Sequence, residues 1–105
     1  MSKVTEKQAE FVLREVARWL GRKMYEDGKP APTGQDAAHK GLGPQLNMTW
    51  DWPGQPTPTV ILESGFAPDE WAVACAQHIQ QKIDARRMKI YVEPYSSYAL
   101  SIYPN

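Results

Sequence analysis

Residues 59–63 have the sequence Thr-Val-Ile-Leu-Glu, a short apolar and β-branched run with Pro58 before it and Ser64 and Gly65 after it. β-Branched side chains fit the pleated surface of a sheet, and proline, serine and glycine are common in the turns that bound strands. The pattern predicts a mostly buried strand over 59–63.

The segment after this strand predicts a helix that begins at Pro68. Proline suits the first helical position, and Asp69 and Glu70 would place negative charge at the positive end of the helix. The apolar residues that follow recur at helical spacing and form one stripe. The stripe consists of Trp71, Ala72, Cys75, Ala76, Ile79 and Ile83.

A hairpin is predicted beyond this helix. Residues 89–93 and 98–103 both show the two-residue alternation of a strand, and the segment between them, 94–97, is short. A short connection requires the two strands to pair in antiparallel fashion. The inner face of the hairpin would consist of Ile90, Val92, Leu100 and Ile102.

Residues 5–27, on the N-terminal side, predict the first helix. Thr5 and Gln8 have the spacing of a capping box, and Gly28 suits the left-handed residue that often ends a helix. The apolar residues that recur at three- and four-residue spacing are Ala9, Val12, Leu13, Val16, Trp19, Leu20 and Met24.

A long proline- and glycine-rich segment, residues 28–58, separates this helix from the strand. Six of the nine prolines and five of the seven glycines lie in it, which excludes a regular helix. The best candidate for a short strand is 47–52, where Met48, Trp50 and Trp52 alternate with polar residues.

Together these elements predict an α+β fold in a single domain, residues 1–105. A chain of this length has room for one hydrophobic core. The expected order is helix, long loop with a possible short strand, strand, helix, strand, strand. The sheet would be small, antiparallel or mixed, with both helices on one face.

Charge and cysteine content restrict the partners and the compartment. Twelve basic and twelve acidic residues give zero net charge, which removes the generic attraction to nucleic acid and anionic membranes. The one cysteine, Cys75, can form no internal disulfide, and no apolar run is long enough for a signal peptide or a membrane span. We therefore expect a cytoplasmic protein without a membrane partner.

Patterns for catalysis or metal binding are incomplete. Cys75 and His78 have a spacing that can place both on one helix face, but a zinc site needs two more ligands. The other histidine, His39, lies in the long loop, and a cysteine nucleophile also needs an oriented base and an oxyanion hole. We expect no metal, no cofactor and no catalytic residue. The alternative is a small enzyme whose candidate groups are Glu63, Asp69, His78 and Glu93.

Aromatic residues outside the helix stripes predict an interaction surface. Trp50 and Trp52 lie in the long loop, and Tyr95 and Tyr98 lie near the tip of the hairpin. Such rings bury a large area at little cost in rotamer freedom, so they often anchor protein interfaces. These four residues predict a non-enzymatic module that binds a protein, with a homodimer as the simplest case.

Nucleic-acid binding is the alternative interaction. Basic residues recur along the first helix and at the end of the second, and with aromatic rings nearby they could hold a single strand. Acidic residues interrupt both groups, which is also typical of a solvated helix surface. The candidate residues are Arg14, Arg18, Arg22, Arg86, Arg87 and Lys89.

Two stretches of the C-terminal third carry a resemblance. Residues 71–75 are Trp-Ala-Val-Ala-Cys, and residues 91–104 are Tyr-Val-Glu-Pro-Tyr-Ser-Ser-Tyr-Ala-Leu-Ser-Ile-Tyr-Pro. They resemble segments of small proteins of actinobacterial phages of the mycobacteriophage type. The resemblance implies the cytoplasm of an infected or lysogenic bacterium, where short accessory proteins bind a host or phage macromolecule. It implies no activity, cofactor or site residue.

Overall fold

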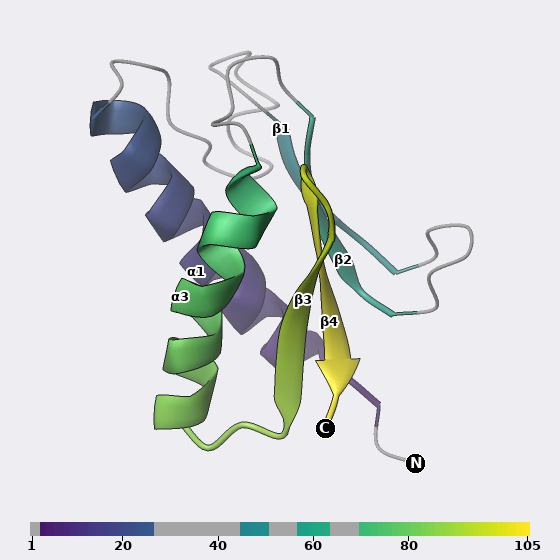
Figure 1. Ribbon diagram of the computed structural model, residues 1–105. Helices are drawn as coiled ribbons and strands as arrows, with labels where there is room; N and C mark the ends of the chain where they lie inside the picture. The colour runs from purple at the N-terminus through teal and green to yellow at the C-terminus, as the bar shows by residue number, and fades with distance from the viewer. Residues whose placement is uncertain (1–2, 27–44, 51–56, 64–69) are drawn as a thin grey trace.

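The computed structural model describes residues 3–26, 45–50, 57–63 and 70–105, in which two helices cover one face of a four-stranded antiparallel sheet (Figure 1). The predicted α+β class is confirmed. Most of the predicted loop over 28–58 lies outside the described residues. The elements are α1 (Glu6–Glu26), β1 (Gln45–Thr49), β2 (Thr59–Glu63), α3 (Trp71–Ala85), β3 (Ile90–Ser96) and β4 (Ala99–Pro104).

The strand order in the sheet is β1-β2-β4-β3, and all neighbouring strands are antiparallel. β2 and β3, which α3 connects, therefore run in the same direction with β4 between them (Figure 1). The predicted hairpin is confirmed as β3 and β4, with Val92 opposite Ile102. Its connection is shorter than predicted, because β3 continues through Pro94 to Ser96 with a shift in register that accommodates the proline at the sheet edge.

α1 begins with the capping box that the sequence predicts. The backbone N–H of Gln8 donates to Thr5 Oγ1 at 3.1 Å, and the backbone N–H of Thr5 donates to Gln8 Oε1 at 2.9 Å. These reciprocal bonds satisfy donors that have no partner within the helix.

The short strand predicted at 47–52 exists, but it lies earlier, as β1. Leu46 is buried and Met48 packs against the core, whereas Trp50 lies in a bend after the strand. The ladder ends where Thr49 pairs with Thr59, the first residue of β2, so the neighbouring strand offers no pairing position for Trp50. The expected alternation that included Trp50 on this strand is therefore wrong, and Trp52 lies outside the described residues.

α3 begins at Trp71 rather than at Pro68. Glu70, the residue before the helix, has φ 53 in the left-handed region, and this conformation cannot continue a right-handed helix. The acidic first turn expected from the sequence is consequently absent from α3. Pro68 and Asp69 lie outside the described residues.

The other end of α3 is a Schellman motif built around Arg87, whose φ is 55. The N–H of Arg87 donates to the carbonyl of Asp84 at 3.1 Å, and the N–H of Met88 donates to the carbonyl of Ile83 at 3.2 Å. This pair of bonds satisfies carbonyl groups at the helix end. Met88 then packs against the core, which directs the chain into β3.

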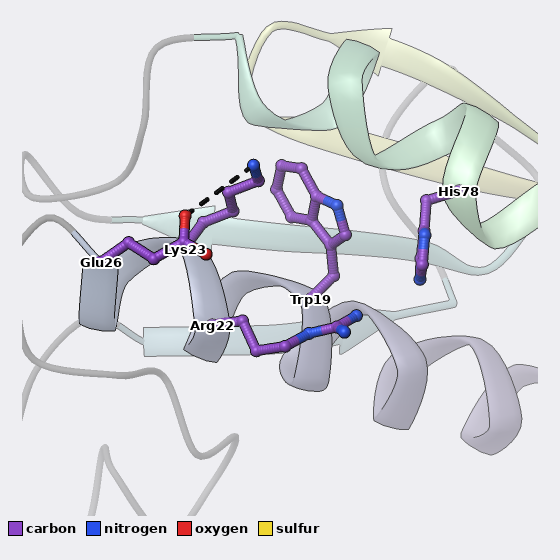
Figure 2. Close-up of a pocket in the computed structure, with 5 residues that line it drawn as sticks. All are labelled: Trp19, Arg22, Lys23, Glu26 and His78. Atoms are coloured by element: carbon purple, nitrogen blue, oxygen red, sulfur yellow. Dashed lines mark ion pairs between the residues drawn. The ribbon is translucent and has the colours of Figure 1, made fainter.

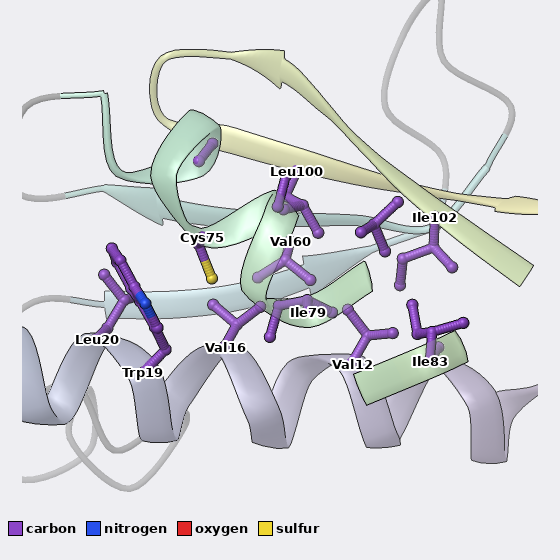
Figure 3. Packing of buried hydrophobic residues seen from close by; sticks show 14 of the residues in the cluster. Val12, Val16, Trp19, Leu20, Val60, Cys75, Ile79, Ile83, Leu100 and Ile102 are labelled. Carbon is purple, nitrogen blue, oxygen red and sulfur yellow. The ribbon is translucent and has the colours of Figure 1, made fainter. Parts of the chain in front are cut away.

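The hydrophobic core lies between the two helices and the inner face of the sheet (Figure 3). All six residues of the predicted α3 stripe are buried, and so are the four predicted for the inner face of the hairpin. From α1, Val12, Val16 and Leu20 are completely buried. Each such side chain contributes roughly 1.5–3 kcal/mol by its burial, so this contact holds both helices on one face, as predicted.

Candidate interaction surface

Large apolar side chains that remain exposed are the first candidates for an interaction surface. In the described part of the chain there are four such residues, and their distribution over the fold decides which of them can act together. They are Trp50, Val73, Tyr95 and Tyr98, with 41%, 50%, 42% and 47% of their surface exposed.

Val73 and Tyr95 lie at the same level of the molecule. The backbone N–H of Val92 donates to Gln80 Oε1 at 3.0 Å, which fixes α3 beside β3. Val73 precedes Gln80 by seven residues, roughly 10 Å along a helix. Tyr95 follows Val92 by three residues, roughly 10 Å along a strand. Because α3 and β3 run in opposite directions (Figure 1), both steps lead the same way.

Val73 also lies on the side of α3 that borders β3. Seven residues make two helical turns, so Val73 and Gln80 share one side of the helix. Tyr98 lies in the turn between β3 and β4, next to the end of the strand that carries Tyr95. We call Val73, Tyr95 and Tyr98 the tyrosine patch. Val73 was not predicted, although an apolar residue outside the buried stripe of its helix is a signal that the sequence contains.

Trp50 lies at the opposite end of the sheet. It follows Thr49, which is level with Thr59 and Ser101, whereas Tyr98 precedes Ala99. Strand geometry separates the backbone of Trp50 from that of Tyr98 by roughly 15–20 Å. The structure therefore does not bring Trp50 together with Tyr95 and Tyr98, because the end of β1 that leads to Trp50 and the hairpin tip lie at opposite ends of the sheet and two strands apart.

The surroundings of the tyrosine patch are acidic. Glu70, directly before α3, and Glu93, two residues before Tyr95, are both exposed. The basic residues Arg86, Arg87 and Lys89 are exposed at the other end of α3. This polarity favours a partner that carries positive charge around an apolar centre, and it disfavours phosphate at the patch.

The basic residues proposed for nucleic acid come from α1 and from the C-terminal end of α3. The Arg86 guanidinium lies over the Phe11 ring, 4.7 Å from its centroid, whereas Arg22 lies eleven residues further along α1, a separation of roughly 16 Å along the axis. Between them, Arg18 Nη1 donates to Oε1 of the buried Glu15 at 2.9 Å. Part of the positive charge on α1 is therefore neutralised within the fold. Arg14 is exposed on the same helix.

A hollow of about 240 Å³ lies between the C-terminal half of α1 and His78 of α3 (Figure 2). Trp19 lies in it between His78 and Lys23, whose Nζ is 5.9 Å from the centroid of the Trp19 ring. Lys23 Nζ also lies 4.0 Å from a carboxylate oxygen of Glu26. Cations in the last turns of a helix stabilise its negative end, so the charge around the hollow has a structural role.

The groups considered for catalysis are kept apart. Cys75 is completely buried, and burial raises the pKa of its thiol to about 12, so the thiolate is scarce near neutral pH. His78 lines the hollow beside α1, whereas Glu93 lies on β3, along the other side of α3. Strand geometry puts the Cα atoms of Glu63 and Glu93 about 16 Å apart. Asp69 lies outside the described residues.

The described residues contain neither a metal-binding cluster nor a helix that could span a membrane. No group of three or more His, Cys, Asp or Glu residues in the described ranges could hold a metal ion. None of the described helices is both long and apolar enough to cross a bilayer. Comparison with protein-family models, with characterised proteins and with solved structures finds no match to the chain.

Proposed function

We propose that the protein is a small non-enzymatic interaction module that binds another protein through the tyrosine patch. One observation carries the proposal. Three of the four exposed large apolar side chains in the described residues belong to the same end of the fold, one on α3 and two on the hairpin. Both of these elements are anchored in the core, so the patch is presented on a rigid support.

The chemistry of the patch supports a protein partner. Tyrosine combines an apolar ring with a hydroxyl, and residues of this kind dominate the binding energy of protein interfaces. The exposed carboxylates of Glu70 and Glu93 attract basic residues at the rim of an interface. The expected partner segment therefore has an apolar centre flanked by lysine or arginine.

Two further parts of the proposal concern assembly and location. We propose that the protein also associates with a second copy of itself, since an exposed strand edge or aromatic patch can be shared about a two-fold axis. We propose the cytoplasm of a bacterium that carries an actinobacterial phage as its site of action. That location rests on the resemblance of residues 71–75 and 91–104 to small phage proteins.

The test compares a variant that loses exposed aromatic side chains inside the tyrosine patch with one that loses an exposed aromatic side chain outside it. Tagged wild-type protein, the double variant Tyr95→Ala, Tyr98→Ala and the variant Trp50→Ala are each used to capture partners from cells that produce the protein. Circular dichroism first checks that each variant keeps its fold. The partner should be recovered at least about 10-fold less with the double variant and equally well with Trp50→Ala, because buried aromatic anchors contribute about 2 kcal/mol or more each.

The opposite pattern would overturn the proposal. Equal recovery with the double variant would reject the tyrosine patch as the contact surface. Recovery of nucleic acid alone, with binding that falls steeply as salt rises, would favour the basic residues of α1 and α3 instead.

A further inference from the structure

The two edge strands of the sheet, β1 and β3, differ in whether their outward backbone groups can pair with another strand. At the β3 edge, the N–H of Asn105 donates to the carbonyl of Lys89, which shows that the backbone N–H and C=O groups of Lys89 face β4. In an antiparallel pair the direction of the backbone N–H and C=O groups alternates from residue to residue. Those of Tyr91 and Glu93 therefore also face β4, and those of the alternate residues point away from the sheet. The outward positions on β3 are Ile90, Val92 and Pro94.

The backbone groups at these outward positions are poorly placed to pair with an added strand. The N–H of Val92 already donates to the side chain of Gln80 at 3.0 Å. Pro94 has no N–H, and the register of β3 shifts immediately after it. A side chain, a proline and a bulge are devices that protect an edge strand from pairing with another chain.

Among the residues that the structure describes, none closes the β1 edge in these ways. The N–H of Ile102 donates to the carbonyl of Pro58, so the carbonyl of Pro58 faces β4. The backbone N–H and C=O groups of the next residue, Thr59, therefore face β1. Thr49 pairs with Thr59, so the backbone N–H and C=O groups of Thr49 face β2. Because these groups alternate in direction along a strand, those of Leu46 and Met48 point away from β2, at the open side of β1, while their side chains pack on the core. No hydrogen bond joins their outward N–H and C=O groups to any part of the chain that the structure describes.

The composition of β1 also lacks the residue types that protect an edge strand. Its five residues, Gln-Leu-Asn-Met-Thr, contain no proline and no charge. Natural edge strands avoid this combination unless something pairs with them, because unpaired backbone groups in register are a template for another strand.

We propose that β1 pairs with β1 of a second copy, antiparallel about a two-fold axis through Asn47. This axis sets Leu46 of one copy opposite Met48 of the other, so the outward backbone groups of both residues are satisfied in both chains. The strand is self-complementary in this register, since no like charges meet across the axis. The result is one continuous sheet. The inference supplies an interface for the self-association proposed above and is independent of the tyrosine patch.

Light scattering during size-exclusion chromatography tests the pairing over a range of protein concentrations. The wild type should show twice the mass of one chain. Asn47→Lys and Asn47→Glu each place like charges across the axis, and each alone should weaken dimerisation at least about 10-fold, because opposed like charges are strongly unfavourable at an interface. An equimolar mixture of the two variants should recover the dimer. Gln81→Lys, which adds a charge on the exposed surface of α3, is the control and should behave like the wild type.

Several results would overturn the inference. A wild type that stays monomeric at every concentration would refute it, and so would an Asn47→Lys variant that dimerises like the wild type. Failure of the mixture to recover the dimer would exclude an axis through Asn47. The tyrosine patch is tested separately, because the double variant Tyr95→Ala, Tyr98→Ala should still dimerise.

Discussion

Replacing Arg87 by glycine should stabilise the protein, although the change removes a whole side chain. Arg87 is exposed and has φ 55 in the Schellman motif that ends α3. A residue with a Cβ atom in this conformation costs roughly 1–2 kcal/mol, because the Cβ approaches the following carbonyl oxygen. Glycine loses about 0.5–1 kcal/mol more backbone entropy on folding. The free energy of unfolding of Arg87→Gly should therefore rise by about 0.5–1 kcal/mol.

Thermal unfolding followed by circular dichroism measures this change. For a domain of this size the expected rise in Tm is about 2–6 °C. Ala85→Gly is the matched control, because Ala85 is the last residue of α3 and glycine there should lower the free energy of unfolding by about 1 kcal/mol. Arg87→Ala separates the loss of the arginine side chain from the backbone effect and should be nearly neutral. If Arg87→Gly lowered Tm as much as Ala85→Gly, the strain argument would be refuted.

Two other predictions concern buried polar groups. The pKa of Cys75 rises on folding from 9.0 to about 12, so the unfolded thiol ionises first and the folded protein should lose roughly 1–2 kcal/mol of stability between pH 9 and 10.5. Denaturant unfolding at both pH values should show this additional loss for the wild type and not for Cys75→Ala; equal losses would contradict it. Arg18→Ala removes the hydrogen-bond donor to the buried Glu15 carboxylate and should cost about 1–3 kcal/mol in chemical denaturation. Arg14→Ala, at an exposed position on the same helix, should cost under about 0.5 kcal/mol, and an equal cost for both would rule out the Glu15 contact as the cause.

Local patterns in the sequence identified the elements whose stability comes from their own residues. β2 lies where its β-branched run predicts it, and the capping box of Thr5 and Gln8 forms as its spacing predicts. The buried stripe of α3 and the inner face of the hairpin follow from periodicity alone. In these places a short segment contains all the information that its conformation needs.

What the sequence did not reveal depends on contacts between distant residues. The left-handed conformation of Glu70, which starts α3 late, has no signature in its residue type. Ala99 and Ser101 alternate along β4 with the predicted inner-face residues and are fully buried, although they do not belong to the core cluster. The Ser101 hydroxyl lies 3.1 Å from Thr59 Oγ1, 42 residues away in the chain. Sheet order is equally non-local, and for that reason the separation of Trp50 from the hairpin tip could not be predicted.

The position of β4 between β2 and β3 affects when this protein can fold during synthesis. β2 and α3 leave the ribosome before β4, but β2 and β3 are not neighbours and cannot close the sheet without it. Until residues 99–104 emerge, the backbone groups of β2 that face β4 remain open to water. Nascent chains with exposed apolar surface and unpaired strands are the ones that chaperones bind and that aggregate. The four-stranded sheet can therefore be completed only after translation of β4, and its completion includes the slow closure of a long loop between β2 and β4.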